Sequence, residues 1–111
     1  MVVRFTIADS ATVSNAQDLR AYWLTGLYIP SGFEGTTLKF KAAQESDDTF
    51  LAVYDDANNE VSMTVAASRY IGFGSSANAR AVESLPWLKL VAGTSQTGAV
   101  EIVGTLAPRA R

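Results

Sequence analysis

Alternation of apolar and polar residues in the first and last runs of residues 36–65 constrains this chain more than any other feature. The first run, TTLKFKAAQ, places Leu38 and Phe40 on one side of an extended backbone and Lys39 and Lys41 on the other. The last run, VSMTV, alternates in the same way. Successive side chains of a β-strand point to opposite faces, so the pattern predicts strands with one buried and one solvated face.

Two polar segments, ESDD and DANNE, divide this stretch into three runs. Asp, Asn and Ser favour turns because their side chains bond to nearby backbone groups. The stretch therefore predicts a three-stranded antiparallel meander as the nucleus of an all-β domain.

The rest of the chain contains further apolar runs between turn residues. We expect an antiparallel two-sheet sandwich, jelly-roll-like, with about eight strands. Gly26 and Gly104 mark candidate bulges, and Gly26 also suits the close approach of another backbone. An extended connection is favoured over a helix capped by Ser14, and residues 74–80 read as a small-residue loop. The expected strands are residues 2–7, 22–29, 36–44, 49–55, 61–65, 69–73, 85–91 and 99–106.

A chain of 111 residues fits one domain, and no linker or repeat divides it. Residues 1–20 are a candidate extended N-terminal arm. Residues 107–111 form a short basic tail, in which Arg109 and Arg111 could reach an acidic neighbour in an assembly.

Composition excludes several functional classes. The chain contains neither histidine nor cysteine, so it lacks the commonest general base, the commonest metal ligand and any disulfide framework. A net charge of −2 creates no basic field for nucleic acid. No apolar run approaches the length of a membrane span, and the first residues do not resemble a signal peptide. We expect a non-enzymatic protein without cofactor, nucleic acid or membrane partner, made in a cytoplasm and not secreted.

Six of the eleven acidic residues lie between Glu45 and Glu60. Ca²⁺ takes clustered oxygen ligands, which makes Asp55, Asn58 and Glu60 a candidate metal set. Their spacing does not match an EF-hand, and turns prefer the same residue types, so the turn interpretation is favoured. Adjacent carboxylates in a strand point to opposite faces, which argues against a catalytic pair.

Two aromatic residues in the run 22–29, Trp23 and Tyr28, have two interpretations. They could form a stacking surface for sugars, but aromatic residues in so hydrophobic a run are more often part of the core. The core interpretation is favoured.

Three segments carry a resemblance: GLYIP, LAVYDDANNEVSMTVAASRYIGF and WLKLVAGTSQTG. Together they resemble the small β-sandwich structural proteins of tailed-bacteriophage virions. The resemblance implies a virion component, most simply a capsid decoration (cement) protein that binds and stabilises the lattice of the major capsid protein. It also implies a homo-oligomer, with a trimer favoured over a dimer. The expected interface residues are Val2, Val3, Arg4, Phe33, Arg109 and Arg111.

The alternative is a carbohydrate-binding module of a phage tail or fibre. The order of LKFKAAQESDDTFLAVYD, WLKL and VEIVGTL is similar to discoidin-like, galactose-binding-like domains. Loops at one end of a jelly roll hold the ligand in those domains, and Phe33 and Arg80 are the loop candidates here. The two functions can share one fold, so the fold alone does not separate them.

Overall fold

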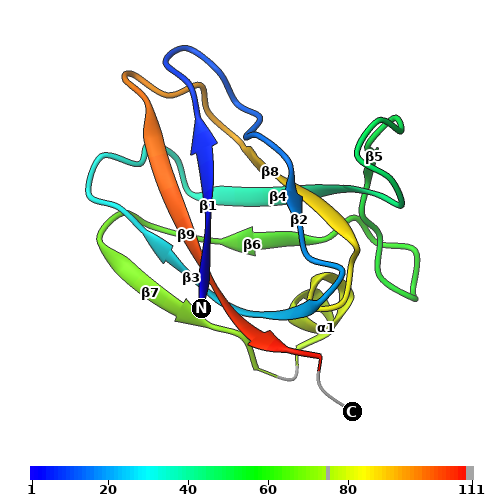
Figure 1. Ribbon diagram of the computed structural model, residues 1–111. Coiled ribbons are helices and arrows are strands. Elements are labelled where there is room, and N and C mark those ends of the chain that lie inside the picture. The colour runs from blue at the N-terminus through cyan, green and yellow to red at the C-terminus, as the bar shows by residue number, and fades with distance from the viewer. Residues whose placement is uncertain (75, 110–111) are drawn as a thin grey trace.

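Two antiparallel sheets pack face to face in the computed structural model, which describes residues 1–74 and 76–109 (Figure 1). This confirms the expected all-β sandwich. The first sheet has the order β1 (Val2–Ile7), β9 (Val100–Pro108), β3 (Tyr22–Ile29), β7 (Arg69–Gly72). The second sheet has the order β2 (Gln17–Asp18), β8 (Trp87–Ala92), β4 (Thr37–Ala43), and β4 also pairs with both β5 (Leu51–Ala52) and β6 (Ser62–Thr64).

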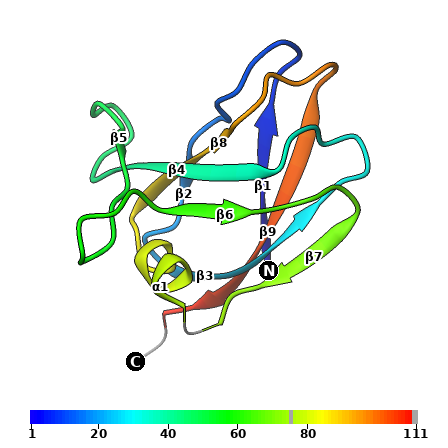
Figure 2. The same cartoon turned by 180° about the vertical axis from the view of Figure 1, so that it is seen from behind.

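The strand pairs are nested along the chain. β1 pairs with β9, β2 with β8, β3 with β7, and β4 with β5 and β6. The chain therefore folds as one long hairpin that is closed by the turn between β4 and β5. Rolling this hairpin up brings β9 beside β3 and β8 beside β4 (Figure 2). This connectivity is that of a jelly roll.

The predicted meander is wrong, because β5 and β6 do not pair with each other but lie along one edge of β4. At Val53 the chain leaves this edge as a hairpin of residues 54–60, and it returns at Val61, whose N–H donates to Val53 O over 2.9 Å. Val53 and Val61 are both buried, whereas the residues between them are polar and mostly exposed. β5 and β6 are thus one strand, interrupted by the 54–60 hairpin.

The core lies between the two sheets and follows the predicted alternation. Leu38 and Phe40 point inward with at most 1% of their surface exposed, while Lys39 is exposed. Burying such a side chain contributes about 1.5–3 kcal/mol. The fully buried large residues of the strands are Phe5, Ile7, Leu24, Leu27, Ile29, Leu38, Phe40, Leu88, Leu90 and Ile102.

Two glycines allow close packing in the first sheet. The register shifts between Leu24 and Gly26, which confirms the bulge predicted in β3. A Cβ on Gly26 would lie 2.8 Å from the carbonyl oxygen of Ile71, so another backbone also approaches here. No register shift occurs at Gly104, and the bulge predicted there is wrong. Gly104 instead leaves room for Leu24, whose Cδ1 atom would lie 2.9 Å from an added Cβ.

The N-terminal segment is not an extended arm. β1 pairs with β9 along its whole length, because Phe5 and Ile7 belong to the core. The following connection is extended, as expected, and covers the free edge of β1. Asn15 Oδ1 accepts a hydrogen bond from Thr6 N–H over 2.7 Å, and Gln17 Nε2 donates to Arg4 O over 2.8 Å.

A short helix, α1 (Ala77–Val82), begins within residues 74–80, which were predicted to be a loop. Ser76 caps it, since its Oγ accepts a hydrogen bond from Ala79 N–H over 3.2 Å. Ala79 and Val82 are buried, and Asn78 Nδ2 donates to Ser62 O over 2.8 Å. Among the described residues, no helix is long and apolar enough to cross a membrane.

Candidate interaction surface

The outward side chains of the first sheet form a continuous face that carries two tyrosines. The strand registers place them in two rows: Arg4, Val103, Tyr28 and Tyr70 in one, and Val2, Thr105, Gly26 and Gly72 in the other. We call these eight residues the tyrosine face. Tyr70 is 78% exposed and Val2 46% exposed. Arg4 is the one charged member, and its Nη1 atom pairs with Glu101 Oε1 over 3.0 Å.

The two tyrosines are cross-strand neighbours on β3 and β7. Their ring centroids lie 4.9 Å apart with an interplanar angle of 44°. Aromatic pairs favour tilted or offset geometry. Contact between the two rings restricts the orientation of each side chain. The face therefore presents preformed aromatic area, which contact surfaces in proteins favour.

The outward face of the second sheet has a different character. Lys39 and Lys89 project from it; Lys39 Nζ pairs with Glu60 Oε1 over 3.2 Å, and Lys89 Nζ lies 4.5 Å above the ring of Phe50. Exposed charges of this type remain hydrated and resist burial in a contact. The exposed aromatic pair makes the tyrosine face the candidate docking surface.

The predicted interface residues are only partly brought together. Val2 and Arg4 lie on the tyrosine face, whereas Val3 packs against the core. The assignment of Phe33 is wrong, because this residue is only 5% exposed and belongs to the core cluster. Its burial also removes it as a ligand-binding aromatic. Arg111 lies outside the described residues.

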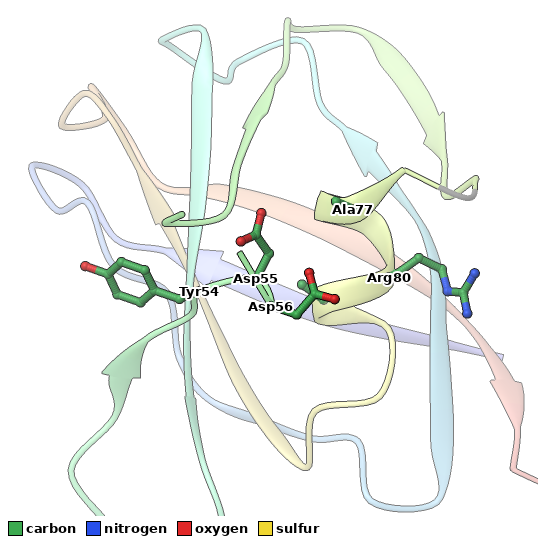
Figure 3. Close-up of a pocket in the computed structure, with 6 residues that line it drawn as sticks. Tyr54, Asp55, Asp56, Ala77 and Arg80 are labelled. Atoms are coloured by element: carbon green, nitrogen blue, oxygen red, sulfur yellow. The ribbon is translucent and has the colours of Figure 1, made fainter. Parts of the chain in front are cut away.

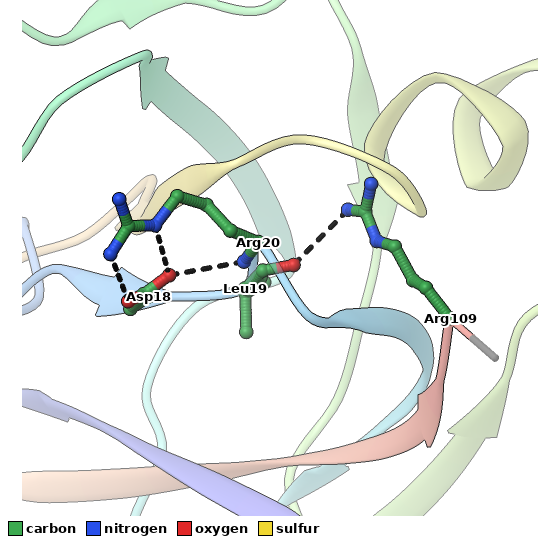
Figure 4. Close-up of polar contacts among 4 residues, drawn as sticks. All are labelled: Asp18, Leu19, Arg20 and Arg109. Carbon is green, nitrogen blue, oxygen red and sulfur yellow. Dashed lines mark hydrogen bonds and ion pairs between the residues drawn. The ribbon is translucent and has the colours of Figure 1, made fainter.

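Arg109 is a structural clamp and not part of a free tail (Figure 4). Its Nε atom donates to Tyr22 O over 2.7 Å and its Nη2 atom to Leu19 O over 3.1 Å. The guanidinium also lies 4.7 Å above the ring of Trp23, so this tryptophan is covered by the chain's own C-terminal segment. The basic side chain thus fastens the end of β9 to the start of β3.

A second arginine, Arg20, forms a two-bond ion pair with Asp18 (Figure 4). The Asp18 carboxylate also accepts a hydrogen bond from the Arg20 backbone N–H over 3.0 Å. Hydrogen bonds from the Arg20 side chain and backbone lower the pKa of Asp18, and the same pair raises the pKa of Arg20. The pair is exposed, and exposed ion pairs contribute little to stability. It stiffens the turn after β2.

The predicted calcium set is not assembled. Asp55 Oδ1 accepts hydrogen bonds from the backbone N–H groups of Ala57 and Asn59, both over 2.9 Å. Glu60 is paired with Lys39, and Asn58 occupies the turn with a φ of 65°. Within the described residues, no three acidic, histidine or cysteine side chains group together as metal ligands would. The turn interpretation accounts for Asp55.

An open hollow of about 410 Å³ separates the 54–60 hairpin from α1 (Figure 3). Tyr54, Asp55, Asp56 and Arg80 are among the residues that line it. The Tyr54 side chain points away from the helix, and Arg80 Nε donates to Glu83 Oε1 over 3.1 Å. Arg80 was a loop candidate for sugar binding; it lies instead on the helix, with its charge already paired.

Replacing Asp55 by alanine should lower the free energy of unfolding by about 1 kcal/mol, because the 54–60 hairpin loses two hydrogen bonds to its backbone. Urea unfolding measures this loss. Replacing the exposed neighbour Asp56 by alanine is the matched control and should change the free energy of unfolding by less than about 0.5 kcal/mol. Added Ca²⁺ should leave the unfolding midpoint of both variants and of the unmodified chain unchanged. A calcium-dependent rise that Asp55→Ala removes would contradict the turn interpretation.

Comparison with protein-family models, with curated proteins and with solved structures found no match. Function is therefore argued from the fold and the surface. Sequence reasoning favoured the core for Tyr28, but this residue is half-buried on the outward face. Sequence reasoning also missed Tyr70 as a surface residue. Alternation around Ile71 indicates that Tyr70 points outward, but its exposure depends on β7 being the last strand of its sheet.

Proposed function

We propose that this chain is a non-enzymatic structural protein that docks on a protein lattice through the tyrosine face. The observation that carries the proposal is the contiguous outward face of the first sheet, which presents two adjacent tyrosines and whose charges Arg4 and Glu101 are paired with each other. Apolar surface of this kind, bordered by polar residues, is typical of contact sites. Three segments resemble tailed-bacteriophage virion proteins. This resemblance supports the major capsid protein of the same virion as the lattice that the chain decorates and cements.

The scaffold supports this role because it holds the face in one shape. The tyrosine face projects from four strands, and most inward residues of β1, β9 and β3 are almost fully buried. A preorganised surface loses little conformational freedom on binding, so more of the contact energy becomes affinity. The lysine-bearing face of the second sheet then remains in solvent. Docking of this kind uses shape and buried area, and it needs no cofactor.

Co-sedimentation with purified empty capsids tests the proposal. The chain should pellet with capsids and stay in the supernatant alone. The double variant Tyr28→Ser and Tyr70→Ser should bind at least about tenfold more weakly, because central aromatic residues dominate contact energies. The matched control is Lys41→Ser with Lys89→Ser on the other sheet, which should bind within about threefold of the unmodified chain. Thermal unfolding of both variants checks that each is folded.

Two outcomes would overturn the proposal. One is an unmodified chain that fails to pellet with capsids of its own virion. The other is a lysine variant that loses binding as strongly as the tyrosine variant, since docking would then use the second sheet. Binding on a glycan array that Arg80→Ala abolishes would instead support the carbohydrate-binding alternative, with the hollow beside α1 as its site.

A further inference from the structure

β7 presents an unpaired backbone edge. Phe73 N–H donates to Thr25 O over 3.0 Å, and hydrogen-bonding groups alternate in direction along a strand. The backbone N–H and C=O groups of Ile71 therefore point toward β3, whereas those of Tyr70 and Gly72 point away from it. β7 is the last strand of its sheet, and both ribbon views show it at the border of the molecule (Figures 1 and 2). Among the described residues, no backbone hydrogen bond reaches Tyr70 or Gly72 from that side.

The free edges of β1 and β6, by contrast, carry hydrogen bonds from side chains of the same chain. Asn15 and Gln17 occupy the outer groups of β1, as described above. On β6, the Ser62 carbonyl accepts a hydrogen bond from Asn78. Natural sheets generally protect their edges in this way because an open edge recruits further strands. The contrast makes the bare edge of β7 conspicuous.

Neither the contacts of Gly72 within its own chain nor its backbone conformation requires glycine at this position. A Cβ placed on it would meet nothing within 4 Å, and its φ is not positive. By comparison, a Cβ on Gly26, its partner on β3, would collide with Ile71 O. Glycine weakens a strand, and it often marks a place where another backbone or a ligand comes close. The space above Gly72 is therefore available to a neighbouring molecule.

We propose that this neighbour is a second copy of the chain, joined through antiparallel pairing of the two β7 strands about a two-fold axis at Ile71. Tyr70 then stands opposite Gly72 of the second copy. The outward N–H and C=O groups of each residue meet their complements, which closes a symmetric set of backbone hydrogen bonds. The exposed Tyr70 ring covers the bare backbone of the opposing glycine, as aromatic residues do for edge glycines elsewhere.

The charges on β7 suit this register. Arg69 is the charged residue of the strand, and the pairing places it opposite Phe73 of the second copy and not opposite the other Arg69. An arginine beside an aromatic ring is a favourable contact. A closed two-fold contact uses the same patch on both copies, so it yields a dimer and not the trimer that the resemblance favours.

The edge of β7 also borders open space. An open groove of about 280 Å³ runs between the edges of β6 and β7, and it is lined in part by Thr64, Gly72 and Phe73. Pairing would join two four-stranded sheets into one and place two tyrosine faces side by side. The four residues of β7 bury little area alone, so we expect a micromolar dissociation constant in solution. On a lattice, proximity of docked copies would raise the occupancy of this contact.

Sedimentation velocity over a series of concentrations, with the purified chain alone, tests the pairing. The unmodified chain should shift from monomer to dimer as its concentration rises. Gly72→Pro should abolish the shift, because proline removes the outward N–H group and leaves the ladder to β3 intact. Gly72→Ala keeps that N–H group, but its Cβ fills the space that the Tyr70 ring of the second copy would cover, so it should weaken association without abolishing it. Tyr70→Ser should weaken association at least about fivefold.

Hydrogen exchange supplies a readout that does not depend on any variant. The amides of Tyr70 and Gly72 should become protected as concentration rises, while the amide of Ile71 is protected throughout. A chain that stays monomeric at every concentration, or a dimer unaffected by Gly72→Pro, would overturn the pairing. Capsids are absent from this experiment, so its failure would leave the proposed docking function standing.

Discussion

Replacing Phe40 by alanine is expected to lower the free energy of unfolding by about 4 kcal/mol. Phe40 is 1% exposed and lies in β4, the strand that pairs with β8 on one edge and with β5 and β6 on the other. Its carbonyl accepts the hydrogen bond from Val53 N–H over 3.1 Å, at the point where the 54–60 hairpin leaves the sheet. Removing the ring leaves a cavity at the junction that organises the second sheet.

Phe50→Ala is the matched control for this change. Phe50 is half-buried outside the core, and its ring contacts Lys89 on the outward face. Its truncation should cost about 1 kcal/mol or less. Urea unfolding followed by far-ultraviolet circular dichroism measures both. Equal losses at the two positions, or a loss below about 1.5 kcal/mol at Phe40, would mean that β4 is not the centre of the core.

Local pattern was enough to find the walls of the sandwich. The alternation of Leu38 and Phe40 with Lys39 and Lys41 identified the inward face of β4 correctly, because the side-chain period of a strand is a property of the backbone itself. Pairing order is a different matter. Whether β5 lies between β4 and β6 depends on which strand edge is free after the sheet rolls up. The residues of β5 do not determine that edge.

Short elements and loops were harder to predict from the sequence, because their structure also depends on tertiary contacts. The helix α1 has six residues, too few to be stable alone, and it depends on the burial of Ala79 and Val82 and on the bond from Asn78 to Ser62. Its local signal was Ser76 as N-cap, which is common in loops too. Phe33 looked exposed because it stands among glycines, yet its loop folds over the end of the core.

That same loop is fastened by a residue that sequence reasoning assigned only to a turn. Gln96 is 2% exposed. Its Oε1 atom accepts from Glu34 N–H over 2.9 Å, and its Nε2 atom donates to Glu34 O over 2.8 Å and to Thr94 O over 2.9 Å. Its own backbone bonds to Ser10 and Ala11. Glutamine is frequent on surfaces, so nothing in the sequence distinguishes a buried one.

Gln96→Ala is therefore expected to lower the free energy of unfolding by about 3 kcal/mol, because it leaves buried partners at Glu34 and Thr94 without hydrogen bonds. Gln44→Ala, at an exposed position after β4, is the control and should change stability by less than about 0.5 kcal/mol. Urea unfolding again provides the measurement. A loss at Gln96 no larger than the loss at Gln44 would contradict the inferred role of its side chain.

Gln96→Glu separates the donor function from mere packing. A protonated glutamic acid can still donate one hydrogen bond, whereas a carboxylate would face the carbonyl oxygens of Glu34 and Thr94 with no proton. Burial and these carbonyls raise the folded-state pKa of the new carboxyl above its unfolded value of about 4.3. A raised folded pKa favours folding at low pH, and this contribution is lost as pH rises through it. The deficit of Gln96→Glu relative to the unmodified chain should thus be small near pH ~4 and grow toward pH ~7.

The control is the unmodified chain measured at the same pH values. It accounts for the effect of Asp18 on the pH dependence of stability, since the lowered pKa of Asp18 acts in the opposite direction. A deficit that stays constant or shrinks across this range would show that the Gln96 amide group does not donate to the loop.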